Sequence, residues 1–235
     1  MNIKVFSDFD ATISIYDVGD EIFKAFGEWN LHWNAYMNNE CDIREVNRRL
    51  CRSLPKDLSI EEITHFALLQ PMDINFNKFA EFCKSKEIPL TVVSDGYIEY
   101  IKPLLSQIGQ SELQVFCNKF GIDSDGFYPI FYGAVEGCYC STASCKRNVV
   151  LNHSSDDDIV VYIGDGYTDF CGAEHSDIVF AKSHLAAYCN KHRIPHYTYK
   201  TFFDVYRILE NKIKTKNLHP RHQARMKRKS AFETE

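Results

Sequence analysis

Four aspartates follow two short hydrophobic runs, one near the N-terminus and one in the second half of the sequence. Asp8 and Asp10 come directly after the first run. Asp165 and Asp169 follow the second, in the stretch Gly164-Asp165-Gly166-Tyr167-Thr168-Asp169. If both runs are parallel strands, their carboxyl ends share the sheet edge where open α/β folds bind ligands, so the four carboxylates can converge. Such a cluster suits a hard cation with oxygen ligands, above all Mg²⁺. Taken singly, each pair could equally be an acidic turn or a helix cap.

A third hydrophobic run, Leu90–Val93, leads into Ser94-Asp95-Gly96. A hydroxyl group and backbone N–H groups at a turn from strand to helix can hold an anion, helped by the dipole of the helix expected from about Tyr97. Lys146 lies near the start of another helical pattern and could add positive charge. A single lysine is usually a surface residue, so Lys146 gains meaning only in the company of the other motifs.

Hydrophobic runs of strand length alternate with helical patterns along most of the chain. This alternation predicts an α/β protein with a Rossmann-like parallel sheet and helices on both faces. The turn Asp123-Ser124-Asp125-Gly126 lies between short aromatic-rich runs and predicts a hairpin. The expected strands are Ile3–Phe6, Ile88–Val93, Leu113–Cys117, Ile159–Ile163 and Asp177–Ala181.

The part of the chain between residues 16 and 75 breaks this alternation. It has several helical patterns but no convincing strand, and Ser59-Ile60-Glu61-Glu62 is a capping box that starts one of the helices. We therefore expect a helical cap inserted after the first strand. The expected divisions are a catalytic α/β core formed by 1–15 and 76–210, a cap formed by 16–75, and a basic, disordered tail at 211–235.

The composition is that of an ordinary soluble protein. The chain has 235 residues, of which 45% are hydrophobic and 25% charged, and this excludes collagen-like, low-complexity and wholly disordered proteins. We expect no membrane association, because the sequence has no apolar run of about 18 residues. The N-terminus lacks the pattern of a signal peptide, and nine cysteines are an odd number for a disulfide framework. These features predict a cytoplasmic protein with reduced thiols.

Charge is unevenly distributed along the chain. Residues 211–229 contain eight Lys or Arg and no Asp or Glu, whereas residues 1–210 carry a net charge of −11. An acidic body is unlike a nucleic-acid-binding core, so we do not expect nucleic acid as a partner. Binding of RNA or another anionic partner through the basic tail remains the alternative from a different class of function.

Together these motifs resemble those of the haloacid dehalogenase superfamily, and specifically its phosphoserine-phosphatase-like branch, which places a helical cap after the first motif. The matching residues, in order, are Asp8-x-Asp10-x-Thr12, Ser94, Lys146 and Gly164-Asp165-Gly166-x-x-Asp169. Within that branch the chain is most similar to phosphatases of methionine salvage. The segments that carry this closer similarity are Glu87-Ile88-Pro89, Cys145-Lys146, Ser176–Lys182 and His196-Tyr197-x-Tyr199-x-x-Phe202. Two positions depart from the pattern, Ala11 and Asp95, where glycine is commoner.

The resemblance implies a Mg²⁺-dependent phosphatase that hydrolyses a small phosphorylated metabolite through an aspartyl-phosphate. Asp8 would be the nucleophile and Asp10 the general acid and base. Crowding by Asp8 and Asp165 would raise the pKa of Asp10, whereas a bound metal would oppose that rise. Asp8, the Asp10 carbonyl and Asp165 would bind the metal, and Asp169 would orient that shell or Lys146. The expected phosphate-binding residues are Thr12, Ser94, Asp95, Gly96 and Lys146.

Several interpretations stay open at this level. The substrate could be phosphoserine or another small phosphomonoester. The protein could also be a non-catalytic relative with the same fold, or a dehalogenase, but the intact set of aspartates disfavours both alternatives. The oligomeric state cannot be predicted. Acidic residues after the first motif could meet a positive substrate group or simply start a helix, and nearby aromatic residues could line the site or pack the cap. These residues are Asp17, Asp20 and Glu21, and Phe26, Trp29, Trp33 and Tyr36.

Three cysteines form a separate cluster in the sequence. Cys138, Cys140 and Cys145 have the spacing C-x-C-x-x-x-x-C, and either Cys171 or Cys117 could be a fourth ligand. Structural zinc needs four ligands and usually has C-x-x-C spacing, so the zinc signal is weak and reduced thiols are the expected state.

Overall fold

A seven-stranded sheet forms the centre of the computed structural model, which describes residues 2–133, 138, 140 and 142–234. The strand order is β4-β3-β2-β1-β5-β6-β7, and all neighbours are parallel except β3 and β4, which form the predicted antiparallel hairpin. The predicted fold class is therefore confirmed. The strands are β1 (Ile3–Ser7), β2 (Leu90–Tyr97), β3 (Gln114–Asp123), β4 (Gly126–Ile130), β5 (Ile159–Gly164), β6 (Ile178–Ala181) and β7 (Tyr197–Thr198).

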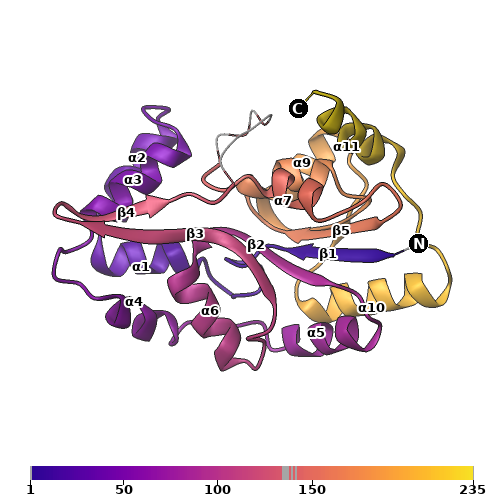
Figure 1. Cartoon of the computed structure of the whole chain (residues 1–235), viewed down its shortest axis with the longest axis horizontal. Coiled ribbons are helices and arrows are strands. Elements are labelled where there is room, and N and C mark those ends of the chain that lie inside the picture. Colours follow the sequence, from indigo (N-terminus) through magenta and orange to yellow (C-terminus); the bar gives the residue numbers. More distant parts are fainter. Residues whose placement is uncertain (1, 134–137, 139, 141, 235) are drawn as a thin grey trace.

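Helices cover both faces of the sheet, with α5, α6 and α10 on one side and α7, α9 and α11 on the other (Figure 1). In the described part of the chain, no helix is both long and apolar enough to cross a membrane. The helices are α1 (Val18–Phe26), α2 (Trp29–Met37), α3 (Ile43–Ser53), α4 (Ile60–Ala67), α5 (Phe76–Ser85), α6 (Ile98–Gln107), α7 (Lys146–Asn152), α8 (Phe170–Glu174), α9 (Ser183–Lys191), α10 (Phe202–Lys214) and α11 (His222–Thr234), with a 3₁₀ turn, η1, at Tyr167–Asp169.

The central strands are largely apolar because each of their faces meets a separate layer of helices. Along β1, Val5 belongs to the core that α5 and α10 cover, whereas its neighbour Phe6 belongs to the core under α7 and α9. The same division separates Val161 from Val160 on β5. Strand alternation thus produces two cores from continuous hydrophobic runs, and polar groups are left for the strand ends.

Four helices, α1 to α4, occupy the chain between β1 and α5, as the interruption of the strand pattern predicted. Their starts are set by side-chain caps: Asp17 accepts from the backbone N–H of Asp20, and Ser59 forms the expected capping box with Glu62. Helix α2, which the sequence did not predict, carries Trp33. Helix α3 packs on β4, and Arg52 there makes two hydrogen bonds to the Asp123 carboxylate, so the hairpin and the inserted helices support each other (Figure 1).

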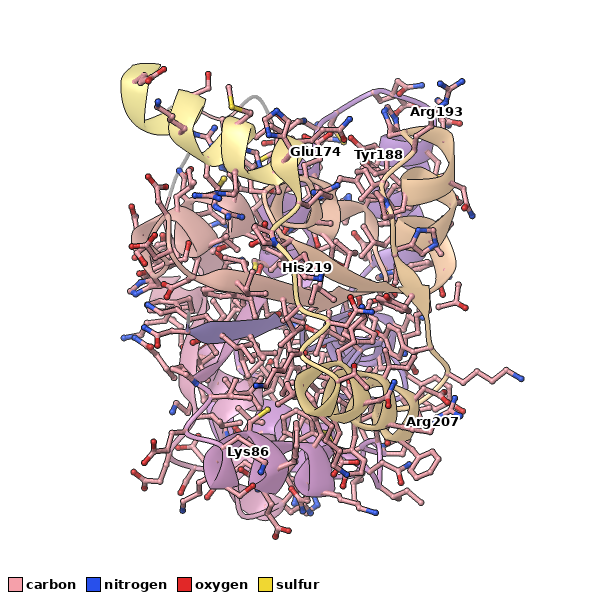
Figure 2. The ribbon with its side chains drawn as sticks, turned by 90° about the vertical axis from the view of Figure 1, so that its right-hand side faces the viewer. Lys86, Glu174, Tyr188, Arg193, Arg207 and His219 are labelled. Atoms are coloured by element: carbon pink, nitrogen blue, oxygen red, sulfur yellow. The ribbon has the colours of Figure 1, made fainter. Side chains whose placement is uncertain are left out.

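The prediction that residues 211–235 form a disordered tail is wrong. Helix α10 continues to Lys214, and the chain then crosses the sheet through the segment that carries His219 to reach α11 on the opposite face (Figure 2). Buried Arg228 holds α11 in place by donating to the His175 carbonyl oxygen at 2.6 Å and to the Asp177 carboxylate. The segment lacked an apolar stripe in the sequence because charged and carbonyl contacts, rather than hydrophobic ones, dock this helix.

Candidate active site

Asp8 lies at the carboxyl edge of the sheet, one residue beyond the end of β1. Its backbone N–H donates to the carbonyl oxygen of Ile163 at 2.9 Å, which extends the pairing of β1 with β5 by one residue. The Asp8 side chain is 7% exposed. The two strands therefore end together and bring Asp8 next to the aspartates that follow β5.

Lys146, the first residue of α7, connects two of these aspartates. Its Nζ lies 2.7 Å from Asp8 Oδ1 and 2.7 Å from Asp169 Oδ1, and the side chain is 1% exposed. Burial alone would lower the pKa of Lys146, but the charges of Asp169 and Asp8 raise it well above its ordinary value. Lys146 is consequently a fixed positive charge within the site, not a surface residue.

Asp169 is held by a full set of donors. Besides Lys146, it accepts from the Tyr162 hydroxyl at 2.8 Å and from the backbone N–H groups of Asp165 and Gly166 at 2.9 Å each. A side chain at Gly164 would collide with the Asp169 carboxylate, which explains the glycine at this strand end. With its hydrogen-bonding capacity occupied in this way, Asp169 is suited to orienting its neighbours.

Asp165 completes the acidic cluster. Carboxylate oxygens of Asp8, Asp165 and Asp169 all lie within 4.8 Å of one another. Thr12 donates its hydroxyl to Asp165 Oδ1 at 2.8 Å, so its side chain contacts the acidic cluster. Burial and then the charge of Asp169 raise the pKa of Asp165 to about 6.

Asp10 has different surroundings, although it is only two residues from Asp8. It accepts hydrogen bonds from the Val18 backbone N–H at 3.0 Å, the Ser94 hydroxyl at 3.2 Å and the Tyr100 hydroxyl at 2.8 Å. Burial, followed by the charge of Asp17, raises the pKa of Asp10 to about 7. The causes of this raised pKa are burial and Asp17, whereas the sequence pointed to crowding by Asp8 and Asp165, opposed by a metal.

Ser94, Asp95 and Gly96 lie beside Asp10, as the sequence indicated, but they belong to an irregular stretch at the end of β2 between Val93 and Tyr97, not to a turn that follows Val93. Ser94 donates to Asp10 and accepts from the Gly96 backbone N–H at 2.9 Å. A side chain at Gly96 would overlap Asp10 and Tyr100, so glycine is needed here for those two residues to meet. The Asp95 carboxylate turns toward the segment before Lys146 and accepts from the backbone N–H groups of Ala143 and Ser144. Burial raises the pKa of Asp95 to about 6.

A cavity of about 1030 Å³ opens over these residues, between the sheet edge and the inserted helices. Asp17, Asp20, Trp33 and Tyr36 line it, whereas Glu21 does not and pairs with Lys24 instead. Of the two interpretations offered for these acidic residues, Asp17 does start a helix, by capping α1, and it also faces the cavity. The remaining aromatic residues of the region mainly pack on neighbours: Phe26 against Phe66, and Trp29 against Trp33.

The sequence analysis missed two tyrosines, Tyr100 and Tyr162, which donate to Asp10 and Asp169 respectively. Tyr162 lies within the expected strand Ile159–Ile163, and Tyr100 lies outside every motif that the sequence indicated. The available signal was the hydroxyl itself, because a buried tyrosine needs a hydrogen-bond partner.

Comparison with known proteins assigns the chain to a family. A family model described as Putative Phosphatase matches residues 3–189. The chain belongs to this family. The expectation that the protein is a phosphatase is confirmed, and the expected likeness to phosphoserine phosphatases is confirmed for the fold.

Relatives match over nearly their whole length. The 2-hydroxy-3-keto-5-methylthiopentenyl-1-phosphate phosphatase of Brevibacillus brevis is 28% identical over 214 residues, which cover 88% of this chain and 95% of the relative. The enzyme of the same name from Bacillus mycoides is 30% identical over 220 residues, 92% of this chain and 100% of the relative. A substrate-bound phosphoserine phosphatase structure has a TM-score of 0.67 at 16% identity, over 90% of this chain and 98% of the other. This phosphatase therefore shares its fold with phosphoserine phosphatase.

Proposed function

We propose that this phosphatase hydrolyses a small phosphorylated metabolite through an aspartyl-phosphate formed on Asp8, with Mg²⁺ as cofactor. The observation that carries the proposal is the position of Lys146, whose ammonium group bridges Asp8 and Asp169 at the carboxyl edge of the sheet. A nucleophilic carboxylate next to a buried cation, at the floor of a cavity, is the arrangement that phosphoryl transfer requires.

The acidic cluster fits a divalent cation. Asp8 and Asp165 offer the hard oxygen ligands that Mg²⁺ prefers, and the Asp10 carbonyl oxygen is the expected third ligand. Burial and the charge of Asp169 raise the pKa of both Asp8 and Asp165, so the cluster is short of positive charge even with Lys146 present. When bound, Mg²⁺ would neutralise charge on the phosphoryl group and on these carboxylates.

The chain's own residues supply the remaining chemistry. Asp8 attacks phosphorus, and the bond from phosphorus to the ester oxygen breaks. Asp10 gives its proton to the departing alkoxide, then takes a proton from the water that attacks the acyl phosphate and releases inorganic phosphate. A pKa of about 7 lets Asp10 both hold and accept a proton near neutral pH.

Phosphate binding is assigned to Lys146, to Ser94 and Thr12, and to backbone N–H groups after Asp8 and at the turn of Asp95 and Gly96. Lys146 is the strongest of these because its charge is buried and fixed. The Asp95 side chain acts indirectly, since its hydrogen bonds tie this turn to the segment that leads into Lys146.

Substrate choice is assigned to the inserted helices. Residues 16–75 would act as the cap over a core formed by 1–15 and 76–210, with Trp33 and Tyr36 facing the bound metabolite. The curated relatives favour 2-hydroxy-3-keto-5-methylthiopentenyl-1-phosphate as substrate. Asp17 and Asp20 favour the alternative, an amine-bearing ester such as phosphoserine, because they place carboxylates on the cavity wall.

The test is the substitution Asp8→Asn in the full chain. A neutral amide cannot form the acyl phosphate, so kcat on p-nitrophenyl phosphate with Mg²⁺ should fall by about 10⁴-fold, while circular dichroism stays unchanged. Asp156→Asn, at an exposed position, is the matched control and should retain full activity. An Asp8→Asn protein with near-normal turnover would refute the proposal. A panel of small phosphate esters, ranked by kcat/KM, then decides between the substrates.

A further inference from the structure

Four cysteine sulfurs meet beside the proposed phosphatase site. Cys138, Cys140, Cys145 and Cys171 each place a sulfur so that all four lie within 4.8 Å of one another. The Sγ atoms of Cys138 and Cys140 are 3.1 Å apart, and those of Cys140 and Cys145 are 3.5 Å apart. All four are free thiols rather than disulfide partners.

These separations are somewhat shorter than those around a tetrahedral zinc ion, and they bring the four sulfurs close enough for one ion to bind all of them. Zinc binds thiolate sulfur at about 2.3 Å, which places sulfurs around the ion about 3.8 Å apart. Four sulfur ligands and no oxygen ligand select zinc over the hard cations that suit the aspartate cluster. We propose that Cys138, Cys140, Cys145 and Cys171 bind one structural Zn²⁺ ion.

The convergence sets these residues apart from the other cysteines of the chain. Cys83 and Cys117, for example, are buried in α5 and β3 and belong to the hydrophobic core. Cys117, which the sequence offered as a fourth ligand, lies outside the group, whereas Cys171 on α8 completes it. Two segments 26 residues apart in the chain, at Cys145 and Cys171, thus contribute to one site.

The surroundings suit bound thiolates. The Thr142 hydroxyl oxygen is 3.3 Å from Cys140 Sγ and donates to the Ser144 carbonyl oxygen at 3.0 Å, so a polar group borders the sulfurs. Four thiolates and one Zn²⁺ carry a net charge of −2, which needs compensation when it is shielded from water. Arg147 follows Cys145 by two residues, is 6% exposed and lines the same cavity, so it supplies nearby positive charge.

The site would join the two halves of the Lys146–Asp169 ion pair. Cys145 directly precedes Lys146, and Cys171 comes two residues after Asp169. A metal that holds these cysteines would fix the start of α7 against α8, and with it the distance between the ammonium and the carboxylate. Zinc would therefore have a positioning role and take no part in the reaction.

Metal analysis of the full chain, purified without chelators, tests the proposal. Inductively coupled plasma mass spectrometry should find about one zinc per chain, and X-ray absorption at the zinc edge should find four sulfurs at about 2.3 Å. In Cys171→Ala and Cys138→Ala the zinc content should fall at least tenfold. Cys83→Ala, which removes a buried thiol outside the group, should keep its zinc.

The same measurements can overturn the proposal. Zinc retained by Cys171→Ala, oxygen or nitrogen ligands in the absorption spectrum, iron in place of zinc, or a wild-type chain without stoichiometric zinc would each contradict it. So would a Cys138–Cys140 disulfide found by peptide mapping under non-reducing conditions. The wild-type spectrum decides the question even if a variant fails to fold. Phosphatase activity does not enter these readouts, so the zinc proposal can fail without the proposed function failing.

Discussion

Asp8 and Asp10 are two residues apart, yet charged groups surround the Asp8 carboxylate and neutral groups surround the Asp10 carboxylate. Asp8 shares its surroundings with Asp165, Asp169 and a buried ammonium group, so charge governs that side of the cavity. Asp10 accepts hydrogen bonds from neutral groups, two hydroxyls and one backbone N–H. The difference separates two tasks: the Asp8 side needs cations and handles the phosphoryl group, whereas the Asp10 side handles a proton.

The largest expected effect comes from removing the cation on the Asp8 side. Lys146→Met leaves the buried Asp8 and Asp169 carboxylates unpaired, which should cost about 3–5 kcal/mol in the free energy of unfolding. Activity should fall to background. Urea unfolding and kcat/KM measure the two effects. Lys191→Met, at an exposed position on α9, is the control and should keep its activity. Near-normal activity in Lys146→Met would contradict the role of this buried cation on the Asp8 side of the cavity.

Breaking the Asp10 side should affect chemistry but much less the fold. Asp10→Asn should lower kcat for alkyl phosphates by about 10²–10⁴-fold, because an amide cannot protonate the leaving alkoxide. The loss in kcat/KM should be smaller for p-nitrophenyl phosphate, whose leaving group needs no proton. Equal losses in kcat/KM for both kinds of ester would contradict the role assigned to Asp10.

Metal binding should distinguish the two sides without any turnover. At a Mg²⁺ concentration 100 times its Kd, the ion should stabilise the wild-type protein by about 2.7 kcal/mol. Thermal unfolding with and without Mg²⁺ should keep this shift in Asp10→Asn, which retains its backbone carbonyl, and lose it in Asp165→Asn. A shift that survives in Asp165→Asn would place the cation elsewhere.

The smallest effect is expected from Tyr100→Phe, which sharpens the description of the Asp10 side. The Tyr100 hydroxyl lowers the pKa of Asp10, so its removal should raise that pKa further. Protonated Asp10 is the acid, and kcat/KM falls as pH rises through its pKa. The basic limb of the pH profile should therefore move to higher pH in Tyr100→Phe. Tyr162→Phe, whose partner is Asp169, should leave that limb in place while losing about 1 kcal/mol of stability.

Much of this arrangement could be predicted from the sequence, because parallel strands put their carboxyl ends at one edge whatever the loops do. That rule alone brought together Asp8, Asp165 and Ser94, although Ser94 lies within the end of β2 and not in the turn that the sequence suggested. The position of Lys146 was predicted from the resemblance to a known family rather than from local pattern, since nothing in its neighbourhood distinguishes it from a surface lysine.

The contacts that escaped prediction depend on tertiary packing. The proximity of Asp17 to Asp10 depends on how α1 leaves the sheet, and Cys171 joins the other cysteines only because α7 lies against α8. Helix α11 escaped because it docks through arginines. A segment rich in charged residues is predicted to be exposed, unless the carbonyl groups that accept hydrogen bonds from its arginines are already known.

The docking of α11 also makes the end of α8 depend on a distant part of the chain. Arg221, which directly precedes α11, donates to the carbonyl oxygens of Ala173, Glu174 and Ser176, and Arg228 pairs with buried Asp177. Without these arginines the carbonyl oxygens would lose their side-chain donors and Asp177 its counter-charge. Residues 221–234 are not among the described residues that line the cavity, yet they brace the segment that follows Asp169.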